Sequence, residues 1–508
     1  MKIFISLGLL ALSFTGFSQQ KIFKITDFGA KPGGSNNNTE SIQKAIDAAG
    51  ASGGTVYIPA GTFLTGVITM RSNVTLNLDA NAVLLASPVR ADYGDSEASP
   101  VIVANNVHNI AINGKGTIDG NGAELLKDLM SRLNAGTLKD DAWGKLNPWH
   151  QMQPQESNRP KIIGFSNCKN ILIKGITLKN GLDWVQDYVK CIDLVVDSIN
   201  VESNTYWNND GIDLVDCKNV QLTHSFFNAD DDGICLKSES RDGMCENIYI
   251  ADCIVRSSAS GIKFGTASHG GFKKVVIKNV KIYDTYRSAI ALESVDGGTM
   301  EDIDISNIDA VNTGNAIFIR VGHRNNDSVY SSVNRIHISN VNVDVPAGKP
   351  DAGYPMEGPI VRFPHNEFPS SIMGLPGHPV KNVVLENIHI TYHGNADKAV
   401  AHFGLDSLNK LPENVKGYPE FSMFGEMPAW GFYTRHAEGV TFKNITLNCL
   451  GIDFRPACIF DDVSGLTLDN ITIPQVKAIP VILVNKVTGY TSNELKIPGN
   501  DKNKVQVK

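Results

Sequence analysis

A short apolar motif recurs along the chain at regular intervals, which is unusual for an ordinary globular domain. Between residues 160 and 340 it recurs in steps of roughly 23 to 33 residues, a period typical of repeat architectures. Each repeat contains a short stretch that alternates apolar and polar residues, a bend, and a second alternating stretch, which leaves little room for helices. The pattern predicts stacked coils of β-strand. The recurring first apolar positions are Ile171, Leu194, Val220, Ile248, Val275, Ile303 and Ile336.

An asparagine occupies the same bend in many of these repeats. Asparagine tolerates left-handed backbone and its amide can bond within the turn, so stacked asparagines suit a corner that every coil shares. Stacking also lets each coil bury a face that no single coil can bury alone. These features predict one long parallel β-solenoid. The corner residues are Asn279, Asn307, Asn340, Asn387, Asn444 and Asn470.

Four segments depart from the repeat. Residues 39–49 have an amphipathic pattern that predicts a short helix with Thr39 as its N-cap, and such a helix can cover the open end of a solenoid. Insertions at residues 121–160, 344–380 and 391–436 are rich in glycine, proline and aromatic residues, and long excursions from a rigid scaffold commonly build binding sites. Aromatic candidates to stack on sugars, with loop anchoring as the alternative role, include Trp184, Tyr418, Trp430 and Tyr433.

The composition fits one large domain made of many turns. The chain has 508 residues, of which 42% are hydrophobic and 46 are glycine. Its net charge of −7 argues against a nucleic acid as partner. Because this charge does not favour an acidic polymer either, binding of such a polymer must depend on local cations. We predict a single catalytic domain over residues 19–508.

Residues 1–18 have the pattern of a secretory signal peptide. Lys2 precedes an apolar run over residues 3–14, and small residues end near Ser18, so we expect the mature chain to begin at Gln19. The apolar run is short for a membrane span, and no cysteine follows the cleavage point to carry a lipid. The sequence therefore predicts a periplasmic or secreted protein without a membrane anchor. A buried first strand is the alternative.

Four of the eight cysteines precede the first apolar residue of their coil by the same three positions. A column of buried thiols that fills the core is the first interpretation. Disulfides between neighbouring coils are the alternative, because stacked strands bring Cα atoms within the usual range for a disulfide. No CxxC pair is present, and we predict neither a metal nor a cofactor. The four cysteines are Cys168, Cys191, Cys217 and Cys245.

The strongest chemical signal is an Asp-Gly-Ile triplet that repeats on consecutive coils. It stands at residues 210–212 and returns at residues 232–234, now preceded by Asp231. Strands in neighbouring coils lie ~4.8 Å apart, so three carboxylates would meet in one small patch. Like charges held this close separate an acid from a base, as a glycosidase requires. The alternative is that Asp210 and Asp232 only cap tight Asp-Gly turns.

The motifs around this triplet resemble those of glycoside hydrolase family 28, the polygalacturonase and rhamnogalacturonan hydrolase family. The paired signature is Trp-Asn-Asn-Asp-Gly-Ile-Asp at residues 207–213 and Asp-Asp-Gly-Ile at residues 231–234. The resemblance extends over nearly the whole mature chain, including residues 26–30, 61–85 and 418–436. It implies an all-β fold, a right-handed parallel β-helix. It also implies an enzyme that hydrolyses pectic glycosidic bonds with inversion.

By this resemblance Asp231 corresponds to the general acid, and Asp210 and Asp232 correspond to the pair that activates water. An inverting site needs its acid and base ~6.5 to 9.5 Å apart, so that water fits beneath the sugar. Asn208 and Asp213 stand beside the first acid and are candidate substrate-binding residues, although an exposed strand position explains Asp213 equally well.

Two further motifs of the family, Gly-His-Gly and Arg-Ile-Lys, are missing from the next two coils. Residues 260–263 (Ser-Gly-Ile-Lys) and residues 291–293 (Ala-Leu-Glu) stand in their places, so the usual carboxylate clamp is absent. If Ile212 and its counterparts in later coils point inward, alternation turns a set of charged residues outward beside the acids. These residues bind a displaced carboxylate or a sulfate, or they form a surface charge ladder with Glu293. The candidate substrate-binding residues of this set, with a histidine on a turn at the same edge, are Lys237, Lys263, Arg320 and His269.

We therefore expect an exported inverting glycosidase that acts on an acidic polysaccharide or oligosaccharide, of the galacturonan or rhamnogalacturonan type in pectin. The long insertions should wall off one end of the cleft, which favours an exo mode. Loss of the clamp makes a neutral sugar such as rhamnose credible at the cleaved position. Two alternatives remain: a polysaccharide lyase, which needs calcium or a basic residue beside a carboxylate, and a non-catalytic carbohydrate-binding solenoid.

Overall fold

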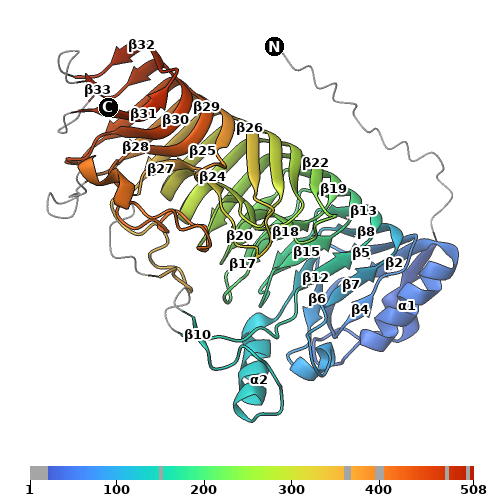
Figure 1. The fold of residues 1–508 in the computed structure, drawn as a ribbon. Helices are drawn as coiled ribbons and strands as arrows, with labels where there is room; N and C mark the ends of the chain where they lie inside the picture. The colour runs from blue at the N-terminus through green and yellow to red at the C-terminus, as the bar shows by residue number, and fades with distance from the viewer. Residues whose placement is uncertain (1–20, 148–152, 360–367, 395–404, 475–479, 499–503) are drawn as a thin grey trace.

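The chain forms an elongated, right-handed parallel β-helix (Figure 1), as the sequence predicts. The predicted signal peptide at residues 1–18 lies outside the described residues, as does Gln19. The computed structural model describes residues 21–147, 153–359, 368–394, 405–474, 480–498 and 504–508.

Each coil in the first half of the chain contributes separate short strands, because turns interrupt the pairing at every corner. These strands are β1 (Ile22–Lys24), β2 (Gly54–Ile58), β3 (Gly61–Thr65), β4 (Ile68–Thr69), β5 (Val74–Leu78), β6 (Ala82–Ala86), β7 (Ile102–Asn105), β8 (His108–Gly114), β9 (Thr117–Asp119), β12 (Ile163–Ser166), β13 (Lys169–Lys174), β14 (Thr177–Lys179), β15 (Gln186–Val189), β16 (Ile192–Asp197), β17 (Asn200–Ser203), β18 (Ile212–Val215), β19 (Lys218–Thr223), β20 (Phe226–Ala229) and β21 (Ile234–Ser238).

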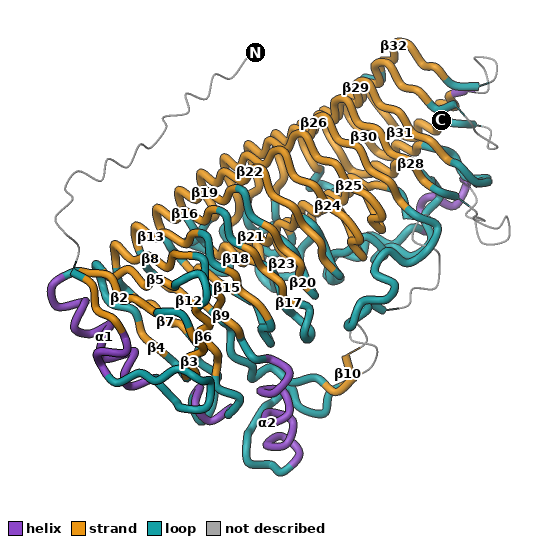
Figure 2. Tube along the Cα trace, turned by 180° about the vertical axis from the view of Figure 1, so that it is seen from behind, coloured by secondary structure: helices purple, strands orange, loops and turns teal. Residues whose placement is uncertain are grey.

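Strands in the second half are often longer, since pairing continues around the corners of the coil (Figure 2). They are β22 (Cys245–Ser257), β23 (Ile262–Ser268), β24 (Gly271–Ser294), β25 (Thr299–Val321), β26 (Ser332–Val345), β27 (Ser370–Met373), β28 (Val380–Tyr392), β29 (Phe432–Cys449), β30 (Cys458–Thr472), β31 (Ile482–Thr488), β32 (Thr491–Lys496) and β33 (Val505–Val507). The remaining elements are the antiparallel pair β10 (Leu146–Asn147) and β11 (Gln153–Pro154), the helices α1 (Thr39–Ser52) and α2 (Gly122–Asn134), and the 3-10 helices η1 (Ile25–Phe28), η2 (Arg90–Tyr93) and η5 (Leu405–Lys410).

The predicted register of the coils is confirmed. Parallel pairing joins Ile171 to Leu194 and continues, position by position, through every recurring apolar residue as far as Ile336. These side chains are buried in one continuous core that runs the length of the solenoid. The coil thus buries its inward residues against its neighbours, and the outward residues of each sheet fall into straight columns.

The asparagine corner is also confirmed. All six predicted asparagines have left-handed backbone, with Asn340 at φ 54°. Each amide donates to the side-chain oxygen of the preceding corner residue; the bonds that Asn340 makes to Asn307 and receives from Asn387 measure 3.1 and 2.9 Å. The corner is therefore a ladder of amides along the molecule, which fixes the stacking distance at the surface.

Substituting Asn340 with alanine is expected to destabilise the protein by about 2 kcal/mol, since alanine loses two amide bonds and strains the left-handed corner. Asn340→Gly is the matched control, because glycine loses the same bonds and adopts positive φ without strain. Thermal unfolding of both variants measures the difference. Equal stability of the alanine variant and the unchanged protein would contradict this role for the ladder.

Helix α1 covers the N-terminal end of the solenoid, as predicted (Figure 1). Its buried side consists of Ile42, Ala45, Ile46 and Ala49. The predicted cap is wrong by one residue, because Asn38 takes the N-cap position and Thr39 begins the helix. No helix of the described residues has the length and apolar character needed to cross a membrane.

Helix α2 lies within the first insertion, where the sequence predicts no regular element. Leu125, Leu129 and Leu133 follow one another at intervals of one helical turn and are buried. Leu125 joins the main core, while Leu129 and Leu133 form a small cluster with Leu138. This helix projects from the same side of the solenoid as the loops around η5 (Figures 1 and 2).

The cysteine column is confirmed as core filling. All eight cysteines are buried and free, so the disulfide alternative does not hold. The carbonyl of Cys168 accepts a backbone bond of 2.9 Å from the residue after Cys191, and the same relation links Cys191 with Cys217 and Cys217 with Cys245. Small thiols therefore stack at one position of successive coils.

Candidate active site

One sheet of the solenoid brings the three acids together. Ile212 of β18 pairs with Ile234 of β21, which places the two Asp-Gly turns one above the other. A side chain on Gly211 would come within 2.5 Å of the carbonyl oxygen of Gly233, so only glycine lets the coils approach this closely. As a result, carboxylate oxygens of Asp210 and Asp232 lie within 4.8 Å of each other.

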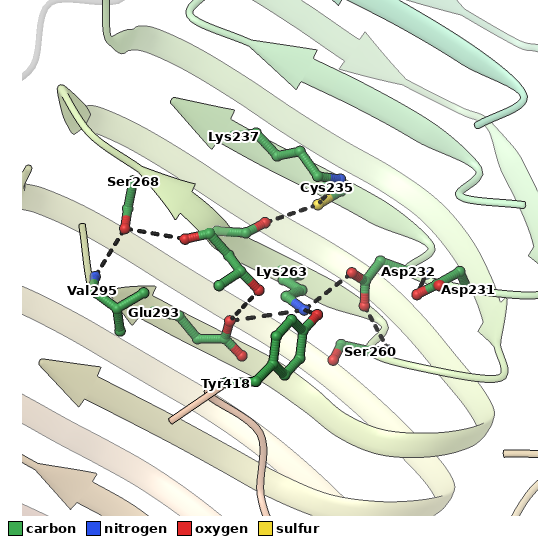
Figure 3. Close-up of polar contacts among 12 residues, drawn as sticks. Asp231, Asp232, Cys235, Lys237, Ser260, Lys263, Ser268, Glu293, Val295 and Tyr418 are labelled. Carbon is green, nitrogen blue, oxygen red and sulfur yellow. Dashed lines mark hydrogen bonds and ion pairs between the residues drawn. The ribbon is translucent and has the colours of Figure 1, made fainter. Parts of the chain in front are cut away.

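Asp232 is bound by a buried lysine from the next coil (Figure 3). Lys263 Nζ lies 3.2 Å from Asp232 Oδ2, and the backbone N–H of Ser260 donates to Asp232 Oδ1 at 3.0 Å. Burial favours the neutral acid, but the positive charges of Lys263 and Arg287 outweigh burial and lower the pKa of Asp232. Asp232 is therefore the ionised member of the group.

Asp231 occupies a different environment although it is adjacent in sequence. Burial and the neighbouring Asp232 carboxylate raise its pKa. Asn208 donates its amide N–H to Asp231 Oδ2 at 3.2 Å, and Arg159 donates to the amide oxygen of Asn208 at 2.9 Å. Because the amide oxygen is held by Arg159, the amide must present its N–H group to Asp231. Arg159 in turn pairs with Glu156 at 2.9 Å.

Asp210 shares a second buried lysine with Asp213. Lys237 Nζ contacts Asp210 Oδ2 at 2.9 Å, the carboxylate of Asp213, and the thiol of Cys235 at 3.0 Å. Burial and the Asp213 charge raise the pKa of Asp210 well above its usual range, although Lys237 opposes the shift. Burial also raises the pKa of Asp213 to about 6. The centre of the Trp184 ring lies 4.2 Å from the same ammonium. Trp184 is therefore next to the acids, and its role is not limited to anchoring a loop.

The third insertion completes the site. The hydroxyl of Tyr418 lies 3.2 Å from Lys263 Nζ, and Tyr418 is 43% exposed. Arg287, which precedes the inward residue of its coil by the same three positions as Asp231, interacts with Tyr418 and Glu420 and with the acids. Burial raises the pKa of Glu420 despite Arg287. Two coils and an insertion thus surround the three acids with charged groups.

Glu293 lies on the far side of Lys263 from Asp232. Its Oε2 atom is 3.7 Å from Lys263 Nζ and accepts a hydrogen bond of 3.4 Å from Thr266 (Figure 3). Glu293 is 1% exposed, and burial raises its pKa to about 7, against the pull of Lys263. The sequence pattern places this residue on the correct face but does not assign it to the site.

This pKa predicts a pH dependence of stability. Since the pKa of Glu293 rises from 4.5 unfolded to about 7 folded, its proton stabilises the folded chain. That stabilisation is complete below pH 4.5 and is lost as the pH rises through 7. We expect the stability of the protein relative to Glu293→Gln to fall by about 3 kcal/mol across this window. Thermal unfolding of both proteins from pH 4 to 8 measures it, and a constant difference would contradict the assignment.

Several predicted substrate-binding residues have other surroundings. Asp213 is fully buried, so the exposed strand position considered for it is wrong. Arg320 is also buried and does not lie open beside the acids; it donates to the backbone oxygens of Gly374, Glu413 and Asn414 at 2.6 to 3.3 Å and so fastens the third insertion to the sheet. Burial lowers the pKa of Arg320 to about 10. His269 follows the far end of β23, whereas the acids precede their strands.

The other predicted substrate-binding residues lie beside the acids as expected, but they contact the acids themselves. Asn208, Lys237 and Lys263 each contact one of the three acids directly. The aromatic candidates Trp430 and Tyr433 are buried in the core. The pairing considered between Lys263 and Glu293 is present, but both side chains are buried and not on the surface. The residues that sequence reasoning missed are Arg159, Cys235, Arg287 and Glu420.

A group of ligand atoms from Asp210, Asp232 and Cys235 has the size of a metal site. The ammonium of Lys237 already lies 2.9 Å from Asp210 and 3.0 Å from Cys235, while that of Lys263 lies beside Asp232. These two ammonium groups thus already contact all three residues of the group. The donor set therefore fits an internal ion-pair network better than a divalent cation.

Known proteins share this fold and these motifs. The model of the glycosyl hydrolases family 28 matches residues 51–352. An exo-poly-alpha-D-galacturonosidase of Dickeya chrysanthemi is 26% identical over 300 residues, which cover 51% of this chain and 50% of that protein. A probable polygalacturonase of Vitis vinifera is 28% identical over 59% of this chain and 56% of its own length. The chain thus spans about half the length of these curated relatives.

Solved structures support the same fold. The family 28 exopolygalacturonase of Yersinia enterocolitica superposes with a TM-score of 0.64 at 18% identity, over 89% of this chain and 78% of that one. An exopolygalacturonase of Thermotoga maritima gives 0.56 at 24% identity, over 73% and 87%. With the family model matching more than half of its residues, the chain belongs to the glycosyl hydrolases family 28.

Proposed function

We propose that the protein is an exported, inverting hydrolase of a pectic polysaccharide or oligosaccharide, of the galacturonan or rhamnogalacturonan type. The observation that carries this proposal is the contrast between two adjacent acids. The pKa of Asp231 is raised, while that of Asp232 is lowered by Lys263 and Arg287. One side chain is thus suited to give a proton and the other to take one, which is the division of roles that glycoside hydrolysis requires.

In the proposed reaction Asp231 donates its proton to the glycosidic oxygen as the bond to the anomeric carbon breaks. A water molecule attacks that carbon from the opposite side and loses a proton to Asp232. Oxygens of Asp210 and Asp232 within 4.8 Å of each other allow one water to hydrogen-bond to both. Asn208 acts by orienting Asp231, and Lys263 keeps Asp232 ionised.

An exo mode and export belong to the same proposal. The first and third insertions contribute residues beside the acids, through Arg159, which bonds Asn208, and through Tyr418, which contacts Lys263. Walls of this kind suit the capture of a chain end. The similarity to relatives named exo-acting supports this mode. The signal-peptide pattern of residues 1–18 supports a periplasmic or secreted location.

Purified protein incubated with galacturonan and rhamnogalacturonan oligosaccharides tests the proposal. Proton NMR during the first turnovers should show release of one terminal sugar whose anomeric configuration is inverted relative to the bond that is cleaved. Initial formation of the retained anomer would contradict inversion. An unsaturated product that absorbs in the ultraviolet and disappears with a chelator would identify a lyase. Binding without any new reducing end would identify a non-catalytic solenoid.

A further inference from the structure

We propose that the subsite at the cleaved bond accepts a sugar without a carboxylate, and that Glu293 enforces this choice. This inference rests on the proposed function and specifies which unit of the acidic polysaccharide the site cleaves. A charged polymer can still bind through its other units, because the argument concerns only the sugar next to the three acids.

The first support is that Lys263 is already engaged by protein carboxylates. Its side chain is 1% exposed, and its Nζ lies 3.2 Å from Asp232 and 3.7 Å from Glu293, with the Tyr418 hydroxyl at 3.2 Å (Figure 3). Glu293 therefore occupies the place from which a substrate carboxylate would pair with this ammonium. A uronate could bind there only by displacing a buried protein carboxylate.

The second support is that Lys237 is engaged in the same way. Its ammonium contacts the carboxylates of Asp210 and Asp213, which are both buried. Pairs of this kind are held in an environment of low dielectric, where removing one partner leaves a charge without compensation. The two lysines of the site thus complete the protein's own ion pairs.

The third support is the excess of carboxyl groups over cations. Among the described residues, the cations beside these groups are Lys237, Lys263, Arg287 and Lys161, and they face the carboxyl groups of Asp187, Asp210, Asp213, Asp231, Asp232, Glu293 and Glu420. Even with Asp231 protonated, carboxyl groups outnumber the cations. Burial raises the pKa values of Asp210, Glu293 and Glu420 even with these cations present, which shows that the described cations do not fully compensate the carboxyl groups already there.

A neutral sugar matches this site better than a uronate. Carboxylates accept hydrogen bonds, and the hydroxyl groups of a sugar donate them. A uronate brings one more carboxylate beside the ionised Asp232, where Lys237 and Lys263 are already paired with protein carboxyl groups, so its charge would be buried without a counter-charge. The site therefore favours a donor-rich ligand, such as a hexose or deoxyhexose unit within a chain that carries its acidic groups elsewhere.

Two matched pairs of substrates test the inference. The first consists of rhamnogalacturonan oligosaccharides that end in rhamnose or in galacturonate, and the second of trigalacturonate and its methyl ester. Within any pair that is cleaved, we expect kcat/KM at least 100-fold higher for the member with the neutral terminal unit. Equal or faster cleavage of the acidic member would overturn the inference while leaving the proposed function intact. No cleavage in either pair would overturn the proposed function, and this inference with it.

The variant Glu293→Gln tests the residue itself. Glutamine keeps the shape and removes the charge, so we expect kcat/KM for the acidic member to rise about tenfold relative to the neutral one. Glu386→Gln is the matched control, since Glu386 pairs with Lys443 at 2.8 Å on a different face of the solenoid, and it should leave this ratio unchanged. An unchanged ratio in Glu293→Gln would overturn the role of this residue.

A measurement on the unchanged protein makes the test independent of how the variant folds. Free galacturonate, its methyl ester and rhamnose are compared as competitive inhibitors of whichever substrate is cleaved. We expect galacturonate to inhibit at least tenfold more weakly than the better of the two neutral sugars. Stronger inhibition by galacturonate than by both would overturn the inference.

Discussion

Replacing Asp231, the proposed general acid, with asparagine is expected to lower kcat by about 10²- to 10⁴-fold, with little change in KM, because a general acid acts only in the transition state. Asparagine nearly matches the shape of the side chain, and its single amide oxygen can still accept one of the two hydrogen bonds that Asp231 receives, from Asn208 or from the backbone N–H of Asp232. It cannot supply a proton to the leaving oxygen. Steady-state kinetics on the oligosaccharide that the protein cleaves fastest measures this loss.

The control for Asp231→Asn is a substrate that needs no acid. Fluoride leaves without protonation, so the glycosyl fluoride of the accepted sugar should be hydrolysed by Asp231→Asn at a rate near that of the unchanged protein. Asp232→Asn should lose activity on both substrates, because both need an activated water. Equal loss on both substrates for Asp231→Asn would show that Asp231 is not the acid.

Replacing Lys263 with methionine should have the largest effect on stability, about 3 to 5 kcal/mol. Methionine has a similar length, but it leaves the carboxylates of Asp232 and Glu293 buried without their shared cation. The pKa of Asp232 should then rise, since Lys263 is the foremost charge that lowers it. We therefore expect a lower unfolding temperature together with a loss of activity at neutral pH.

The double variant Lys263→Met with Glu293→Gln separates the ion pair from packing. Removing the second carboxylate should restore part of the lost stability, because one fewer buried charge lacks a partner. Activity should recover less, since Asp232 still lacks its cation. If the double variant is no more stable than Lys263→Met alone, the pair with Glu293 does not contribute. Thermal unfolding at pH 7 compares the double variant with Lys263→Met and with Glu293→Gln.

The scaffold is predictable from the sequence because one rule repeats in every coil. Period-two alternation determines which side chains point inward, and the fixed recurrence of Ile171 and its counterparts determines which coils stack. The same register brings Asp210 and Asp232 together, since the residues that follow their Asp-Gly turns pair with each other. Counting three residues back from the inward position of the next coils also leads to Arg287.

The partners of the site residues are less predictable. Alternation shows that Lys263, Glu293 and Arg320 share a face, but it does not show which of them pair. That choice depends on the insertions, whose conformation follows no repeat. Arg159 and Glu420 reach the site only because residues 156–159 and 405–431 fold back against the sheet.

Helix α2 illustrates a different kind of miss. The leucines at residues 125, 129 and 133 carry a helical period, yet glycine and proline recur in the rest of the insertion. Because the sequence is interpreted as β-strand coils joined by irregular insertions, no helix is predicted in this segment. The spacing of these leucines indicates a helix whatever the architecture around it.

Arg320 attaches the third insertion to the sheet through the backbone of the insertion. Its guanidinium donates hydrogen bonds to main-chain oxygens, which every amino acid has, and these bonds do not require particular side chains. The hold of Arg320 on the insertion therefore does not depend on the side chains of residues 413 and 414, although these make bonds of their own, from Glu413 to Arg435 and His436 and from Asn414 to the backbone oxygen of Met423. Substitutions elsewhere on this segment can change the surface beside Lys263 and Tyr418 while Arg320 keeps its main-chain anchors.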